Sequence, residues 1–171
     1  MQIVVLQGPN LNRLGLRKPE IYGTRTLADV QAEMDEKAGE LGCNLIHFQS
    51  NSEGALIDRL QELQDESDAI ICNPAGLTNY GLSLRDALAE TERDLAITHL
   101  TNIHAREEWR RHDVFAEVAD IYQAGLGWRV YLFAIDALHQ RYVERNTATG
   151  SPPRDRRHGE TRQRKLNQQC R

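Results

Sequence analysis

The sequence predicts an α/β fold, namely a doubly wound parallel sheet of five strands with helices on both faces. Short β-branched runs that end at Gly, Pro or Asn alternate regularly with segments in which apolar residues recur at helical spacing. Because these segments follow one another through short connections, they form right-handed βαβ units, in which the strands pair in parallel and the helices pack back onto the sheet. With 171 residues and 40% hydrophobic content, the chain is long enough to bury one core.

The individual elements follow from these patterns. Strands are predicted for the apolar runs at residues 1–7, 43–49, 68–72 and 94–100, with a shorter fifth run near residues 119–124. Helices are predicted at residues 27–41, 53–65 and 82–91, and after Gly127. The first helix begins with a hydroxyl cap, Thr26, three positions before the acidic Asp29. Residues 8–24 hold several Gly and Pro without a sustained period, which indicates a long irregular loop of the kind that commonly carries function.

We expect one catalytic domain at residues 1–144, followed by a basic and disordered tail at residues 145–171. The tail carries eight Lys or Arg and two acidic residues, whereas the whole chain has a net charge of −4. Its composition offers too little apolar surface to offset the entropy lost on ordering. A basic tail can contact nucleic acid, but without interleaved aromatic residues a solvated extension is the expectation, and nucleic acid is not an expected partner.

The composition excludes several classes of protein. No run reaches the ~18 apolar residues that a membrane helix needs, so no membrane span is expected. Residues 1–7 lack the basic and apolar regions of a secretory signal, so we expect the protein in the cytoplasm. The three cysteines, Cys43, Cys72 and Cys170, are far apart and form no CxxC pair, so neither a disulfide framework nor a zinc site is expected.

Polar side chains follow the predicted strands, and the carboxyl ends of parallel strands lie at one edge of a sheet, where ligands of such folds bind. These side chains are Asn10, Asn12, Arg17, Tyr22, Asn51, Glu53, Asn73, Asn79, His99, Thr101, Asn102, His104 and Arg106. The chain has no GxGxxG, P-loop or GxSxG motif and no His pair at metal-ligand spacing, so nucleotide, metal and serine-hydrolase chemistry are not expected.

The remaining residue types suit proton transfer, because a tyrosine, an arginine and a histidine are predicted at neighbouring strand ends. Tyrosine is a weak base at its free pKa of ~10. An arginine at ~4 Å supplies about 4 kcal/mol at an effective dielectric of ~20, which lowers the tyrosine pKa by ~3 units. Arg17 is therefore able to make Tyr22 a base.

Four motifs, in this order and spacing, resemble those that define the type II 3-dehydroquinate dehydratases: LQGPNLNRLGLRKPEIYG, FQSNSEG, CNPAGLTNYGLSLRDAL and THLTNIHAREEWRRH. The resemblance covers about residues 2–138. It implies a flavodoxin-like fold and a homo-oligomer in which trimers assemble to a dodecamer. It also implies trans elimination of water from 3-dehydroquinate to give 3-dehydroshikimate, with no metal and no cofactor. The step belongs either to aromatic amino acid biosynthesis through the shikimate pathway or to quinate catabolism.

The resemblance implies four catalytic residues. Tyr22, kept ionised by Arg17, removes the proton beside the ketone and produces an enolate; both residues lie on a lid loop. Asn10 helps to hold the enolate through a water molecule. His99 then protonates the departing hydroxyl group, so that the elimination has both a base and an acid.

The resemblance also implies a set of substrate-binding residues. Asn73, the backbone of Leu100 and Thr101, and the side chain of Arg110 hold the substrate carboxylate and ring hydroxyls. Asp86 reaches into the site from a neighbouring subunit, which makes an oligomer necessary for activity.

The third motif departs from the family pattern at Leu77, Asn79 and Tyr80. Asn79 stands in place of a substrate-facing histidine, and because its amide still donates and accepts hydrogen bonds, it is expected to bind the substrate as well. Ser52 likewise replaces a histidine in the second motif. An alternative is therefore a diverged paralogue that acts on, or only binds, a related cyclic hydroxy ketone. A second alternative is a non-catalytic protein that binds a ligand or nucleic acid through the basic tail. It is disfavoured because a pure binding protein needs neither the base nor the acid.

Overall fold

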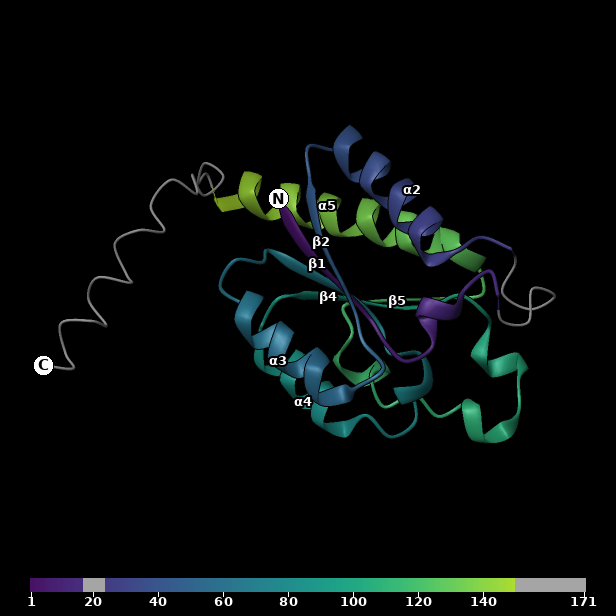
Figure 1. Cartoon of the computed structure of the whole chain (residues 1–171). Coiled ribbons are helices and arrows are strands. Elements are labelled where there is room, and N and C mark those ends of the chain that lie inside the picture. The colour runs from purple at the N-terminus through teal and green to yellow at the C-terminus, as the bar shows by residue number, and fades with distance from the viewer. Residues whose placement is uncertain (17–23, 150–171) are drawn as a thin grey trace, which may run out of the picture. The chain divides into compact units, whose positions relative to one another are not determined.

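The computed structural model describes residues 1–16 and 24–149. Five strands, β1 (Gln2–Gln7), β2 (Asn44–Gln49), β3 (Ala69–Asn73), β4 (Asp94–His99) and β5 (Ile121–Ala124), form one sheet. All neighbouring strands are parallel, in the order β2-β1-β3-β4-β5. The helices are α2 (Leu27–Glu40), α3 (Glu53–Leu63), α4 (Leu82–Glu90) and α5 (Val130–Thr149) (Figure 1). This strand order is the flavodoxin-like one, so the predicted doubly wound sheet is confirmed.

The end of the chain differs from the prediction. The predicted tail begins at residue 145, whereas α5 continues through Thr149, so residues 145–149 are helical. Extending an existing helix adds one backbone hydrogen bond per residue, and this requires no apolar periodicity. Residues 150–171, the remainder of the predicted tail, lie outside the described residues, as do Arg17 and Tyr22. Residues Met1–Gln140 form one compact unit, which contains all five strands of the sheet.

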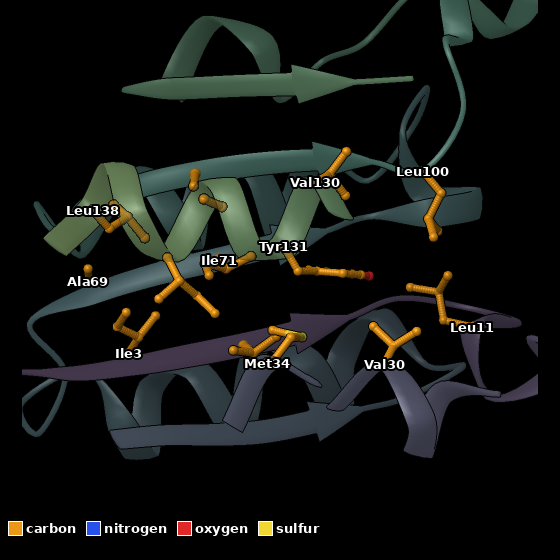
Figure 2. Packing of buried hydrophobic residues seen from close by; sticks show 14 of the residues in the cluster. Ile3, Leu11, Val30, Met34, Ala69, Ile71, Leu100, Val130, Tyr131 and Leu138 are labelled. Atoms are coloured by element: carbon orange, nitrogen blue, oxygen red, sulfur yellow. The ribbon is translucent and has the colours of Figure 1, made fainter. Parts of the chain in front are cut away.

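The sheet is covered on both faces by apolar clusters. On one face, Val30 and Met34 of α2 and Tyr131 of α5 pack against β1 and β3 (Figure 2). On the other face, side chains from α3 and α4, such as Leu60 and Leu88, pack against the same strands. Figure 2 also shows that the Tyr131 hydroxyl points along the strands toward their carboxyl ends. Within the described parts of the chain, no helix has the length and apolar character needed to cross a membrane.

Helix caps account for several of the motif residues. The predicted capping box at the start of α2 is confirmed, because the Asp29 N–H donates to Thr26 Oγ1 at 3.2 Å and the Thr26 N–H donates to Asp29 Oδ2 at 2.9 Å. Ser52 caps α3 by accepting from the N–H of Ala55. Glu53 Oε1 accepts from the N–H of Leu84 in the first turn of α4 at 3.0 Å. Ser52 and Glu53 thus fix the helices that follow β2 and β3.

Gly8 allows the ends of β1 and β3 to approach closely. Its N–H donates to the carbonyl of Asn73 at 2.9 Å, and a Cβ at this position would lie 2.4 Å from the carbonyl oxygen of Pro74. That oxygen belongs to the backbone, so the contact is relieved only by moving the strand ends apart. The segment after β1 therefore lies against Asn73 because residue 8 is a glycine.

We predict that Gly8→Ala lowers the free energy of unfolding by about 1–3 kcal/mol, the usual cost of overpacking a tightly packed site. Urea denaturation measures the change. Gly39→Ala is the matched control, because Gly39 lies within α2 and nothing lies within 4 Å of a Cβ built there. That variant is expected to gain up to about 1 kcal/mol from helix propensity. A stability loss in the control equal to that of Gly8→Ala would contradict the steric explanation.

Candidate active site

A cavity of about 330 Å³ lies at the carboxyl ends of β1, β3 and β4. Three stretches that directly follow these strands form much of its wall, and the segment that carries Trp109 and Arg110 completes it. The residues that line it are Pro9, Asn10, Leu11, Arg13, Leu14, Asn73, Ala75, Gly76, Thr78, Asn79, Tyr80, His99, Leu100, Thr101, Ile103, Arg106, Trp109 and Arg110. The cavity thus lies where the sequence predicts the ligand.

Three arginines line the cavity although the whole chain carries a net charge of −4. Arg13, Arg106 and Arg110 line it, and no Asp or Glu does so among the residues that the structure describes. The Arg110 guanidinium lies 4.0 Å from the centre of the Trp109 ring, and its Nε is 3.0 Å from Glu107 Oε2, so the side chain is held in place. Such a wall favours an anionic ligand, such as a carboxylate.

His99 ends β4 and contributes to the cavity wall, although only 4% of its surface is exposed. Its Nε2 lies 2.7 Å from Oδ2 of Asp113, whose side chain is also buried. The remaining ring nitrogen, Nδ1, is then the one available to a ligand. Sequence reasoning missed Asp113, because it lies fourteen residues beyond His99 in an irregular segment with no local motif.

The Asp113 carboxylate has three hydrogen-bond partners. Its Oδ2 also accepts from the Tyr122 hydroxyl at 2.9 Å, and its Oδ1 accepts from the N–H of Phe115 at 2.9 Å. Burial by itself raises the pKa of Asp113, but its interactions with His99, the Phe115 N–H and Tyr122 together outweigh burial and hold the pKa below its usual value. Burial and the neighbouring carboxylate raise the pKa of Tyr122. At neutral pH the pair is therefore an ionised Asp113 and a neutral Tyr122.

Asn73, the last residue of β3, is held in one orientation. Its Nδ2 donates to the Tyr131 hydroxyl at 2.9 Å, and its Oδ1 accepts from the N–H of Ala75 at 3.1 Å. Burial raises the pKa of Tyr131 to about 12, so this partner stays neutral. One N–H of the Asn73 amide is left for a ligand in the cavity. The backbone at Ala75 has a φ of 51°, an uncommon value for a residue with a side chain and one typical of functional loops.

Asn79 lies on the cavity wall, but the N–H groups of its side-chain amide donate to backbone carbonyls and not into the cavity. Its Nδ2 donates to the carbonyls of Trp109 and His112, both at 2.6 Å. Both amide hydrogens are thus used to hold the segment that carries Arg110, and only Oδ1 is left for a ligand. The structure therefore assigns Asn79 a supporting contact that the sequence did not predict.

Asn10, Leu100 and Thr101, three of the residues proposed for the site, all line the cavity. Asn10 has a φ of 68°, and its N–H donates to Asn51 Oδ1 at 2.8 Å, which joins the segment after β1 to the end of β2. Asp86 lies on α4 outside this cavity, with 67% of its side chain exposed, and it pairs with Arg85.

Arg17 and Tyr22 lie outside the described residues, but the chain on either side of them is near the cavity. Leu14 lines the cavity, and the next residue, Gly15, packs against Thr24: a Cβ on Gly15 would lie 2.8 Å from the carbonyl oxygen of Thr24. Gly15 has a φ of 79°, which a glycine adopts readily. The described chain therefore has Gly15 and Thr24 side by side, directly after Leu14 in the cavity wall.

Neither of the two thiols in the described part of the chain lines this cavity. Cys43 and Cys72 are free and buried, and burial raises the pKa of both thiols, which keeps them protonated. Over residues 1–16 and 24–149, no group of three His, Cys, Asp or Glu side chains is placed to hold a metal ion.

Comparison with known proteins identifies the family. The model of the family "Dehydroquinase class II" matches residues 1–139. A 3-dehydroquinate dehydratase of Herpetosiphon aurantiacus is 50% identical over 141 residues, which are 82% of this chain and 98% of that protein. A catabolic 3-dehydroquinase of Verticillium alfalfae is 44% identical over 146 residues, which are 84% of this chain and 97% of that protein.

Solved structures show the same relationship. The type II dehydroquinase of Propionibacterium acnes is 37% identical with a TM-score of 0.78, and the match covers 81% of this chain and 96% of that one. The type II dehydroquinase of Butyrivibrio crossotus is 36% identical with a TM-score of 0.79, and the match covers 81% of this chain and 97% of that one. The predicted resemblance is thus confirmed, and the chain belongs to the class II dehydroquinase family.

Proposed function

We propose that this chain is a 3-dehydroquinate dehydratase, a hydro-lyase that converts 3-dehydroquinate to 3-dehydroshikimate by trans elimination of water through an enolate. The observation that carries the proposal is a buried histidine, His99, in the wall of an arginine-lined cavity at the carboxyl ends of the strands. The substrate is a carboxylate with ring hydroxyls, so it needs cationic and hydrogen-bonding groups around it. Family membership and the names of the relatives support the same reaction.

Substrate binding is assigned to residues that share this cavity. Arg110, Asn73 and the backbone of Leu100 and Thr101 hold the substrate carboxylate and ring hydroxyls. The fixed orientation of Asn73 supports this assignment, because an amide that is already held loses little further entropy on binding. Arg13 and Arg106 add positive charge to the same wall and raise its affinity for an anion.

Proton removal is assigned to Tyr22, with Arg17 as the cation that keeps the phenol ionised. This assignment rests on their positions in the first motif, which the chain shares with the family. The Tyr22 oxygen takes the proton beside the ketone, and the resulting enolate is held through a water molecule on Asn10. The described chain on either side of residues 17–23 lies beside the cavity, which supports placing the base there.

Loss of water completes the reaction. The protonated His99 ring gives a proton to the departing hydroxyl, the carbon–oxygen bond breaks, and the enolate electron pair forms the new carbon–carbon double bond. The products are water and a conjugated enone. No metal ion and no cofactor enters this scheme.

The decisive experiment is a continuous ultraviolet assay of the purified full-length chain with 3-dehydroquinate and a chelator, which follows formation of the conjugated enone. We expect steady turnover that the chelator leaves unchanged. A folded protein that gives no enone at high substrate concentration would contradict the proposed function.

We also infer a homo-oligomer in which trimers assemble to a dodecamer, with Asp86 completing the site of a neighbouring subunit. The exposure of Asp86 outside its own cavity supports this arrangement. Leu82, in the first turn of α4 and one helical turn before Asp86, is also more than half exposed, as expected for a surface that becomes buried on assembly. We place the protein in the cytoplasm, where the step serves either aromatic amino acid biosynthesis or quinate catabolism.

The contacts of Asn79 yield a prediction for substrate affinity. Asn79→Asp keeps the shape of the side chain but removes both N–H donors, and it places a negative charge beside two carbonyl oxygens. The segment that carries Arg110 then loses two hydrogen bonds worth about 1 kcal/mol each. We expect KM for 3-dehydroquinate to rise by about 5–50-fold, with a smaller change in kcat.

Steady-state kinetics measure this change, and Asn44→Asp is the control. Asn44 is an exposed residue at the start of β2 and does not line the cavity, so its variant is expected to keep the KM of the parent chain. A KM for Asn79→Asp within twofold of the parent would show that the two hydrogen bonds do not support substrate binding.

A further inference from the structure

We propose that Asp113, itself held by Tyr122, is a positioning residue for His99: it fixes the imidazole tautomer so that the proton given to the departing hydroxyl leaves from Nδ1. The role of that proton rests on the proposed function, whereas the tautomer is a property of the folded chain. Neither Asp113 nor Tyr122 is among the described residues that line the cavity, so both act through His99 and not on the substrate.

The geometry allows one assignment of the ring protons. A carboxylate only accepts hydrogen bonds, so His99 Nε2, at 2.7 Å from Asp113 Oδ2, must carry a hydrogen. In the neutral ring, Nδ1 then has none and faces the cavity as an acceptor. In the charged ring, Nδ1 carries the proton that is transferred. After transfer to the hydroxyl, the ring is left as the neutral Nε2–H tautomer and regains its proton from solvent.

The surroundings hold the carboxylate so that it cannot turn away. The side chains of His99 and Asp113 are only 5% and 2% exposed, so water does not compete for this hydrogen bond. The Phe115 N–H binds the other carboxylate oxygen, and the Tyr122 hydroxyl shares Oδ2 with His99. The Tyr122 ring also lies against the imidazole, with centroids 5.6 Å apart and an angle of 51° between the planes. Rotation of the imidazole is therefore blocked by the ring and by the carboxylate.

The kinetic test uses Asp113→Asn, which keeps the size of the side chain but can present an N–H to Nε2 and so favour the wrong tautomer. We expect kcat to fall about 100-fold or more while KM stays within about twofold, because only the proton donor is disturbed. Tyr122→Phe removes one hydrogen bond to the carboxylate and is expected to lower kcat about 2–10-fold. In a His99→Ala background, Asp113→Asn should cause no further loss of kcat, since it acts through the ring.

The chain provides a matched control. His47 Nε2 lies 2.9 Å from Asp35 Oδ1, which is the same pair of groups outside the cavity. Asp35→Asn removes that carboxylate and is expected to leave kcat and KM unchanged. A kcat for Asp113→Asn within threefold of the parent, or a loss equal to that of Asp35→Asn, would overturn the proposal.

A spectroscopic test needs neither a variant nor turnover. Long-range ¹H–¹⁵N NMR of the ¹⁵N-labelled full chain identifies the protonated nitrogen of each histidine, and the His99 signals are those that a His99→Gln variant lacks. We expect the Nε2–H tautomer, with Nδ1 unprotonated when the ring is neutral. An Nδ1–H tautomer would overturn the proposal, even if Asp113→Asn failed to fold. Absence of turnover in the parent chain together with the Nε2–H tautomer would contradict the proposed function and leave the positioning of His99 intact.

Discussion

Tyr22→Phe is expected to abolish turnover of 3-dehydroquinate while leaving the fold and substrate binding nearly intact. The substitution removes one oxygen atom, which is the proposed acceptor of the proton beside the ketone, and leaves the ring in place. General-base catalysis typically contributes 10²–10⁴-fold, so kcat should fall by about 10³-fold or more. The measurement combines the ultraviolet assay with calorimetric titration of the substrate onto the inactive variant.

The control for this prediction is Tyr142→Phe, which removes a phenol hydroxyl from α5 outside the cavity and is expected to keep full activity. Residual turnover of Tyr22→Phe above about one tenth of the parent rate would show that another group is the base. Loss of substrate binding together with activity would show that Tyr22 holds the substrate and does not only accept its proton. These outcomes separate a base from a binding residue.

The second large effect is expected at His99, where two substitutions separate catalysis from stability. His99→Ala and His99→Gln both lack an imidazole, so kcat should fall by about 10²–10⁴-fold in each. Glutamine keeps an N–H that can donate to Asp113, whereas alanine leaves the buried carboxylate without this partner. We therefore expect only His99→Ala to lose stability at neutral pH, by about 1–3 kcal/mol, the cost of an unsatisfied buried acceptor.

The pH dependence of this stability loss has a definite sign. In the parent chain, the pKa of Asp113 is lower than in the unfolded state, so its contribution to stability is present at neutral pH and disappears as the pH falls through the folded-state pKa. Urea denaturation of parent and His99→Ala at neutral and acidic pH should therefore show a stability difference that shrinks in acid. A constant difference across this range would mean that the loss comes from packing and not from Asp113.

Much of the candidate site can be predicted by finding the polar residues that directly follow the predicted strands. The sequence predicts Asn10, Asn73, His99, Thr101 and Arg110 as site residues, and all of them line one cavity. The physical reason is that parallel strands end at the same edge of the sheet, so residues that follow different strands are brought together without knowledge of side-chain packing. Arg110 is the exception, since only the family resemblance predicted it.

The residues that the sequence did not reveal act through contacts between distant segments. Asp113 bonds to His99, which lies 14 positions away in the chain. Tyr131 bonds to Asn73, which lies 58 positions away. Neither has a local pattern that separates it from an ordinary packing residue. The sequence also does not predict that Asn79 supports the segment of Arg110, because its amide bonds to carbonyls 30 and 33 residues away.

Local patterns in the sequence predict the order of strands and helices along the chain, the edge of the sheet where the cavity lies and several of the polar residues that line it. These depend on local periodicity, helix caps and glycine positions, which short segments encode. The three-dimensional contacts are needed to show which nitrogen of His99 bonds to Asp113, what holds Asn73 and how the segment of Arg110 is fixed. A hydrogen bond between buried side chains forms only if its two atoms are placed to within a few tenths of an ångström. The spacing of residues along the chain does not specify positions so closely.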